Sequence, residues 1–165
     1  MWTVIKFKKE SVGLLKKDLK NKIGSDFIIY RPKTIIQKYK KNKLINLEYE
    51  ILGDYLFCYH KNFENKNILN QMKFLKGAKY FLNGFVEYQK DIKHFIEKCR
   101  KIENRNGFIT ENLFETNLNG TYKFSTGPFT DKIFKIIEFQ QSKINILMGN
   151  LKTTIKKRDY IFKPI

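Results

Sequence analysis

Residues 44–59 read LINLEYEILGDYLFCY and hold two strands with a turn between them. Over residues 44–51 polar and apolar side chains alternate, as they do in a strand with one solvated face. Gly53 and Asp54 follow and favour a turn. Residues 55–59 are apolar or aromatic throughout, which is typical of a central strand buried on both faces. The stretch therefore predicts a sheet at the centre of the fold.

The residues before this stretch predict more strands of the same sheet. Bulky side chains alternate over residues 2–7, and residues 27–30 and 34–36 are rich in β-branched and aromatic types. Residues 40–43, KKNK, are polar and fit the tip of a hairpin. We expect a mainly antiparallel sheet.

An amphipathic helix is expected between the first two strands. Ser11 is suited to the N-cap, and Gly24 to the C-terminal stop. Leu15, Leu19 and Ile23 recur every four residues, with lysines over much of the remaining surface. This helix should pack on the sheet through its leucines.

Two more helices and a strand complete a first domain, residues 1–103. Residues 66–75 suggest a short helix, and residues 79–82 a strand. Residues 88–102 carry the strongest helical pattern of the chain, with apolar side chains at intervals of three and four.

The pattern changes after this helix. Residues 104–117 are rich in Asn and have no sustained period, so we place a linker there. Residues 118–165 hold short β-like segments separated by turns, which predicts a small β-barrel. The expected segments are residues 121–124, 132–139, 143–148, 151–155 and 160–162. The fold class is therefore α+β, an antiparallel sheet with flanking helices followed by a barrel.

The composition is that of a folded, basic protein. Hydrophobic residues make up 42% of the 165 residues and aromatic residues 15%, which is enough to build a core. The net charge of +17 favours polyanionic partners such as DNA or RNA. Lys, Asn, Ile and Phe are all abundant, so the same excess also fits AT-rich coding sequence whose lysines occupy solvated faces.

Two further features concern the compartment. Cys58 and Cys99 lie in apolar contexts and imply no disulfide framework. No leader pattern follows Met1, and no apolar run is long enough to span a membrane. We expect a monomer in the reducing cytoplasm, without a membrane partner.

Several strings, in this order, resemble the NusG family of transcription factors and its RfaH paralogues. MWTV at residues 1–4 is similar to the family's opening strand, and EILGDYLF at 50–57 to its Leu-Phe-Pro-Gly/Asn-Tyr-Leu-Phe strand. KGAKYF at 76–81 resembles an Arg-Gly-Val-x-x-Phe step. In the last part, STGPF at 125–129 and KINILM at 143–148 resemble the KOW module. The resemblance spans almost the whole chain and implies a NusG-type N-terminal domain with a KOW barrel.

The resemblance implies an apolar patch that binds the clamp helices of the RNA polymerase β′ subunit, with the β subunit as a further contact. Its residues here are Leu52, Tyr55, Phe57 and Trp2. Large aromatic side chains are effective interface anchors, although the same residues also suit a sheet–helix core. Lys6 stands where an aromatic is expected in RfaH, and Gly53-Asp54 replaces Pro-Gly.

Two basic segments are candidates for contacts with upstream duplex or non-template DNA through phosphates. Solvated-face charge is the alternative. The residues are Lys16, Lys17 and Lys20 on the expected helix, and Lys40, Lys41 and Lys43 at the hairpin tip.

The KOW module implies a partner surface at Phe129, Ile133 and Phe134, for Rho or for the ribosome through NusE. Phe134 stands where this module usually has a glycine. RfaH-like members hide this sequence as a helical hairpin, but the turns at Gly127 and Gly149 favour a stable barrel here.

The resemblance therefore implies a transcription elongation and antitermination factor that suppresses pausing without catalysis. The alternative is a KOW-type RNA- or ribosome-binding protein without a polymerase role. An enzyme is not supported, because His60 and His94 are isolated and no metal, nucleotide or nucleophile motif occurs. We expect no cofactor and no metal.

Overall fold

The computed structural model describes the backbone of residues 1–165 and every side chain except that of Lys66. The chain folds into two compact units, one of residues 1–32 and 50–101, the other of residues 33–49 and 102–165. The first unit contains β1 (Trp2–Phe7), η1 (Lys9–Ser11), α1 (Val12–Ile23), β2 (Ile28–Tyr30), β5 (Tyr55–Tyr59), η2 (Lys61–Glu64), α2 (Lys66–Met72), β6 (Ala78–Phe81) and α3 (Gln89–Lys101). The second contains β3 (Lys33–Lys40), β4 (Lys43–Glu50), β7 (Phe108–Ile109), β8 (Thr121–Phe124), β9 (Ile133–Phe139), β10 (Lys143–Met148), β11 (Leu151–Lys156) and β12 (Phe162–Pro164). The predicted α+β class is confirmed.

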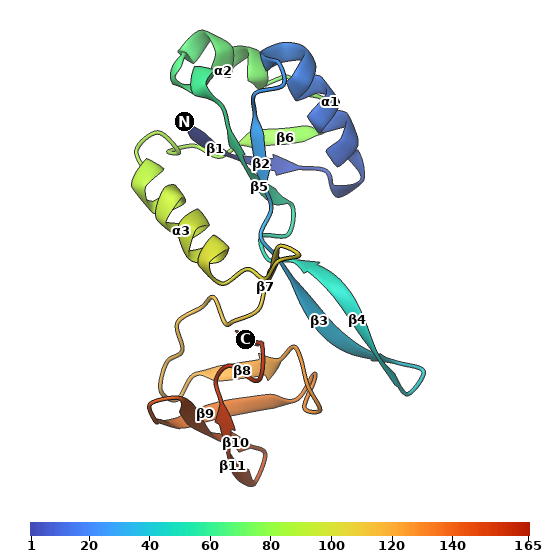
Figure 1. Ribbon diagram of the computed structural model, residues 1–165, viewed down its shortest axis with the longest axis vertical. Helices are drawn as coiled ribbons and strands as arrows, with labels where there is room; N and C mark the ends of the chain where they lie inside the picture. Colours follow the sequence, from blue (N-terminus) through green and yellow to red (C-terminus); the bar gives the residue numbers. More distant parts are fainter. The chain divides into compact units, whose positions relative to one another are not determined.

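The sheet of the first unit has the order β2-β5-β1-β6, and all its pairs are antiparallel. β5 is an inner strand with Leu56, Phe57 and Cys58 buried, as its apolar sequence predicts. Helices lie on both sides of this sheet, α1 and α2 on one face and α3 on the other (Figure 1).

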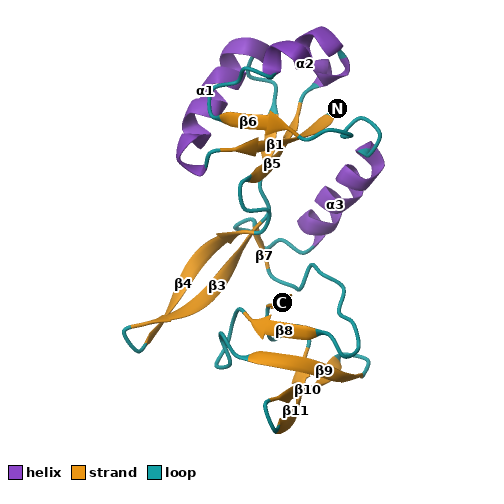
Figure 2. Cartoon of the chain, turned by 180° about the vertical axis from the view of Figure 1, so that it is seen from behind, coloured by secondary structure: helices purple, strands orange, loops and turns teal.

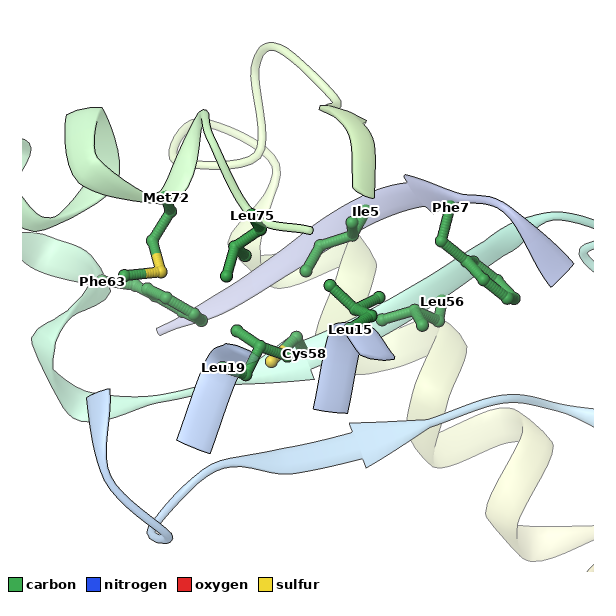
Figure 3. Packing of buried hydrophobic residues seen from close by; sticks show 9 residues of the cluster. All are labelled: Ile5, Phe7, Leu15, Leu19, Leu56, Cys58, Phe63, Met72 and Leu75. Atoms are coloured by element: carbon green, nitrogen blue, oxygen red, sulfur yellow. The ribbon is translucent and has the colours of Figure 1, made fainter. Parts of the chain in front are cut away.

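The face under α1 and α2 holds the larger core of this unit. In Figure 3 Leu15 and Leu19 of α1 meet Leu56 and Cys58 of β5. The predicted limits of α1 are confirmed, with Ser11 at the N-cap and Gly24 at the C-cap. Ser11 makes no side-chain capping bond, whereas the amide of Gly24 donates to the carbonyl of Lys20 at 3.0 Å.

The two strands of residues 43–59 were expected in one sheet, but they belong to two different sheets. β4 does not join β5; it pairs with β3, and β7 adds to β3 in parallel, in a separate sheet of order β4-β3-β7. Residues 51–54 form the turn that separates the two, with Gly53 at a φ of +62°. Such a backbone angle is readily adopted by glycine and lets the chain leave one sheet for the next. Figure 2 shows β3 and β4 as a long two-stranded ribbon.

The last five strands form an antiparallel sheet of order β11-β10-β9-β8-β12, which encloses a second core. The core contains aromatic side chains and isoleucines, and the ring centroids of Phe124 and Phe134 are 4.3 Å apart. The expected short strands of the C-terminal part are therefore present, with their ends shifted by at most two residues.

The segment predicted as a linker packs on this second unit. Ile109 and Leu113 are buried. The side-chain amide of Asn112 donates to the carbonyls of Lys157 and Tyr160, at 3.2 and 2.9 Å, and its oxygen accepts from the amide of Phe162 at 2.8 Å. Residues 102–117 and the β3–β4 ribbon thus belong to the compact unit of the barrel, whereas the sequence placed 33–49 in the first domain.

Candidate functional site

The sheet face beneath α3 is only partly covered. Cross-strand pairing puts Trp2, Val4 and Phe57 on this face, and Ile92 and Ile96 of α3 pack over them. Trp2 is 8% exposed and Phe57 is 6% exposed. Both were predicted as clamp contacts; the structure buries them in the protein's own core, because α3 covers that end of the face.

The rest of the face is partly exposed: Lys6, Leu52 and Tyr55 are half-buried and Tyr80 is 45% exposed. Lys6 pairs with Tyr55 on one side and with Tyr80 on the other, so three neighbouring strands present these side chains in one row. Leu52 precedes Tyr55 in the turn, and its carbonyl accepts from the amide of Tyr55 at 3.1 Å. Leu82 follows Tyr80 and is 42% exposed. We call Lys6, Leu52, Tyr55, Tyr80 and Leu82 the tyrosine patch.

The polar atoms of the tyrosine patch interact with one another. The hydroxyls of Tyr55 and Tyr80 are 3.1 Å apart, and the Lys6 ammonium lies 5.0 Å from the Tyr55 ring centroid and 5.7 Å from that of Tyr80. Asp54 limits the positive charge, since its carboxylate is 3.8 Å from Lys6 and 3.4 Å from Lys79. The patch is therefore aromatic and apolar, with one cation at its centre.

These contacts shift three ionisations. The hydrogen bond from Tyr80, followed by that from Lys6, lowers the pKa of Tyr55 below 10.0. The hydrogen bond with Tyr55 raises the pKa of Tyr80 above 10.0. The pKa of Lys6 is raised above 10.5, chiefly by its hydrogen bond to Tyr55, so Lys6 is cationic at neutral pH.

Tyr80 was missed as a patch residue in the sequence. Its neighbours at 79–82 suggested a strand, but only the register of β6 against β1 brings Tyr80 beside Lys6. Lys6 itself was noticed only as a departure from the family pattern. In the structure its ammonium lies close to both tyrosine rings.

The candidate nucleic-acid lysines lie in two places. Lys16, Lys17 and Lys20 are exposed on α1, and Lys40, Lys41 and Lys43 are exposed at the tip of the β3–β4 ribbon. The first group belongs to the first unit and the second group to the other.

The predicted partner surface of the barrel is divided by the alternation of β9. Ile133 is 53% exposed, but Phe134 is 1% exposed and packs on Tyr122, Phe124 and Phe162. Phe134 is thus a core residue rather than a surface residue. Phe129 is half-buried against Phe124 and Tyr160.

Neither a metal cluster nor a membrane-spanning helix occurs in the described part of the chain. Its His, Cys, Asp and Glu side chains form no group of three or more suited to a metal ion. None of its helices is long and apolar enough to cross a membrane. Cys58 and Cys99 are buried, and burial raises the pKa of Cys58 to about 12.

Comparison with solved structures finds distant similarities. The fold resembles the MjSpt4:Spt5 complex in its crystal conformation B, with 12% identity and a TM-score of 0.32 over 100% of this chain and 97% of that chain. A second similar structure, which describes the domain interaction in Thermotoga maritima NusG, is 13% identical. The TM-score is 0.34, and the match covers 94% of this chain and 91% of that chain. No family model and no curated protein matches the sequence. Similarity this distant carries no argument about residues or partners.

Proposed function

We propose that this protein is a non-enzymatic transcription elongation and antitermination factor of the NusG type, and that the tyrosine patch binds the clamp helices of the RNA polymerase β′ subunit. The single observation that carries the proposal is this partly exposed row of side chains beside α3. Two residues of the patch, Leu52 and Tyr55, belong to the segment EILGDYLF, which carries the family resemblance.

The chemistry of the tyrosine patch suits a helical partner. Tyr55 and Tyr80 offer broad rings with polar tips, and Leu52 and Leu82 add apolar surface. Tyrosines of this kind dominate interface energetics because they bury much area and lose few rotamers. In this proposal Trp2 and Phe57 lie beside the patch, under α3, and do not touch the partner.

Binding of this kind needs no catalysis to suppress pausing. A factor that binds the elongating conformation of the polymerase more tightly than the paused one shifts the population toward elongation. The barrel recruits the second partner, Rho or the ribosome through NusE, with the exposed Ile133 and the half-buried Phe129 as contacts. Lys16, Lys17, Lys20, Lys40, Lys41 and Lys43 make the DNA phosphate contacts.

The decisive experiment is a pull-down with a β′ clamp-helix fragment from the same source, at about 0.1 M and about 0.5 M salt. We expect the wild type to bind at both, because an apolar contact survives the screening of charges. Tyr55→Ala should weaken binding about 10-fold or more, as expected for a central aromatic anchor. Phe74→Ala is the matched control: Phe74 is 82% exposed and follows α2, which packs on the opposite face of the sheet.

Circular dichroism establishes that both variants are folded. If the wild type fails to bind at either salt concentration, or if Tyr55→Ala and Phe74→Ala bind equally well, the clamp contact is wrong.

A specific feature of the barrel favours the second candidate, an RNA- or ribosome-binding KOW protein. On the outer side of its sheet Leu147 of β10 lies between Lys135 and Lys152 of the neighbouring strands. Basic side chains on one outer surface suit the phosphates of RNA. This candidate predicts binding that falls steeply with salt and does not depend on Tyr55.

A further inference from the structure

The two sides of the β3–β4 ribbon differ in charge. β3 ends at Lys40 and β4 begins at Lys43, and the two residues between them, Lys41 and Asn42, have φ angles of +49° and +60°. A two-residue turn of this kind fixes the register and places Lys40 beside Lys43. The hydrogen bond between the side chains of Gln37 and Asn46, 3.1 Å long, agrees with this register.

One side of the ribbon carries Lys38, Lys40 and Lys43 together with Leu47 and Tyr49. We call these five residues the lysine face. Leu47 is 39% exposed and Tyr49 is 41% exposed, so neither side chain is buried in the core. Lys163 of the barrel adds another cation, with its ammonium 5.8 Å from the centroid of the Tyr49 ring.

Among residues 33–49, no carboxylate lies on this side of the ribbon. The only acidic residue among residues 33–49 is Glu48, which belongs to the other side and accepts from Lys33 at 3.4 Å. Like charges placed opposite each other on a ribbon are destabilising, and Lys40 beside Lys43 is such a pair. An anionic partner would remove this repulsion.

The ribbon is held in place by its own unit. The amide of Gln37 donates to the carbonyl of Ser125 at 2.7 Å, and the Gln37 side-chain oxygen accepts from the amide of Gly127 at 2.7 Å. At its base Thr34 donates to the carbonyl of Ile109 at 2.7 Å. A surface that is already ordered loses little conformational entropy when it binds.

We propose that the lysine face binds single-stranded nucleic acid, with an unpaired base stacked on Tyr49 and the phosphates bound by the lysines. The inference rests on the phosphate contacts assigned above to Lys40 and Lys43, and extends them to a specific ligand.

An exposed tyrosine ring favours a single strand over a duplex. In a duplex the bases are stacked on one another and present only their edges, so Tyr49 would find no ring to stack on. Unpaired bases stack on aromatic side chains while their phosphates follow a basic surface. Eight residues of β3 span about 26 Å, enough for several nucleotides.

The test measures the fluorescence anisotropy of labelled nucleic acids as the protein, residues 1–165, is added. The nucleic acids are two 12-nucleotide strands, oligo-dT and oligo-U, and a 12-base-pair DNA duplex. We expect a single strand to bind more tightly than the duplex, and the comparison of the two strands identifies the preferred sugar. Tyr49→Leu, which keeps the apolar volume but has no ring, should weaken single-strand binding about 10-fold and leave its salt dependence unchanged. Tyr49→Phe should bind like the wild type.

Two matched controls separate stacking from charge. Tyr39→Leu removes an equally large ring from the other side of the ribbon, where it is 57% exposed, and should leave binding unchanged. The double substitution Lys40→Gln, Lys43→Gln should lower the slope of log K against log salt by about 1.4, because each lysine that no longer pairs with a phosphate lowers it by about 0.7. Lys9→Gln with Lys76→Gln removes the same charge elsewhere and should change the slope less.

Equal affinity for duplex and single strand with no effect of Tyr49→Leu would overturn the proposal, as would no binding of either strand at about 50 mM salt. The clamp pull-down contains no nucleic acid and depends on Tyr55. Failure of one proposal is therefore distinguishable from failure of the other.

Discussion

Tyr55 and Phe57 illustrate how two residues of one strand acquire different roles. They are two positions apart and lie on the same face of the sheet, so their alternation in the sequence treats them alike. Phe57 is covered by Phe95 of α3, with ring centroids 5.8 Å apart, whereas Tyr55 lies beyond the helix and meets Tyr80 instead. The position of one helix decides which aromatic remains available to a partner.

The shared hydrogen bond between the two tyrosines should be visible in their titration. The pKa of Tyr55 is lowered and that of Tyr80 is raised, so Tyr55 should lose its proton first as the pH rises through 10. Tyr80→Phe removes the donor to the Tyr55 phenolate and should raise the pKa of Tyr55; Lys6→Met should act in the same direction. The measurement is an NMR titration of ¹³Cζ-labelled tyrosine.

Lys9→Met, a change in η1, serves as the control and should leave both titrations as they are. Indistinguishable midpoints for Tyr55 and Tyr80 in the wild type would contradict the shared hydrogen bond.

At the scale of the elements, the turn at residues 125–129 contacts two other segments of its unit. Its residues were recognised in the sequence as the Gly-Pro-Phe string of a KOW module. The structure adds what the turn contacts: Thr126 accepts from the amide of Ile161 at 2.8 Å, and Gly127 donates to Gln37 of β3. The turn thus joins the ribbon to the barrel.

Gly127 and Gly149 form a matched pair for testing this turn. Both have positive φ, +82° and +60°, which an L side chain adopts at a cost of about 1 kcal/mol. A Cβ at Gly127 would also lie 2.7 Å from the Tyr160 ring, while one at Gly149 would meet nothing within 4 Å. We expect Gly127→Ala to lower the free energy of unfolding by about 2–4 kcal/mol and Gly149→Ala by about 1 kcal/mol.

Urea denaturation followed by circular dichroism measures both variants. Equal losses at the two glycines would mean that Tyr160 moves aside without cost, and that the turn is not tightly packed.

At the scale of the whole molecule, the two units have separate cores. Leu19 is fully buried in the core between α1 and β5, and Ile146 is fully buried in the barrel. A unit with its own core is expected to open on its own.

Substitutions in the two cores should therefore have separate effects. Leu19→Ala and Ile146→Ala each leave a cavity and should cost about 2–5 kcal/mol of stability. Amide hydrogen exchange of the full chain should show lost protection in β1 and β5 for Leu19→Ala, and in β9 and β10 for Ile146→Ala. Loss of protection throughout the chain in either variant would show a single cooperative unit.

The sequence by itself determined the kinds of element and most of their limits. The period of four in α1, the apolar run of β5 and the short strands after Gly120 are local patterns, because helix and strand repeat within a few residues. The exposure of the candidate nucleic-acid lysines could also be predicted, because lysine side chains are mostly exposed in folded proteins.

Only the tertiary structure decided which of these residues meet. The assignment of β4 to the ribbon, the packing of Asn112 on the barrel and the row of Tyr55, Lys6 and Tyr80 all depend on contacts between distant parts of the chain. Burial of Trp2, Phe57 and Phe134 likewise follows from what lies over them. Alternation shows that two side chains share a face, but the element packed on that face determines whether they form core or surface.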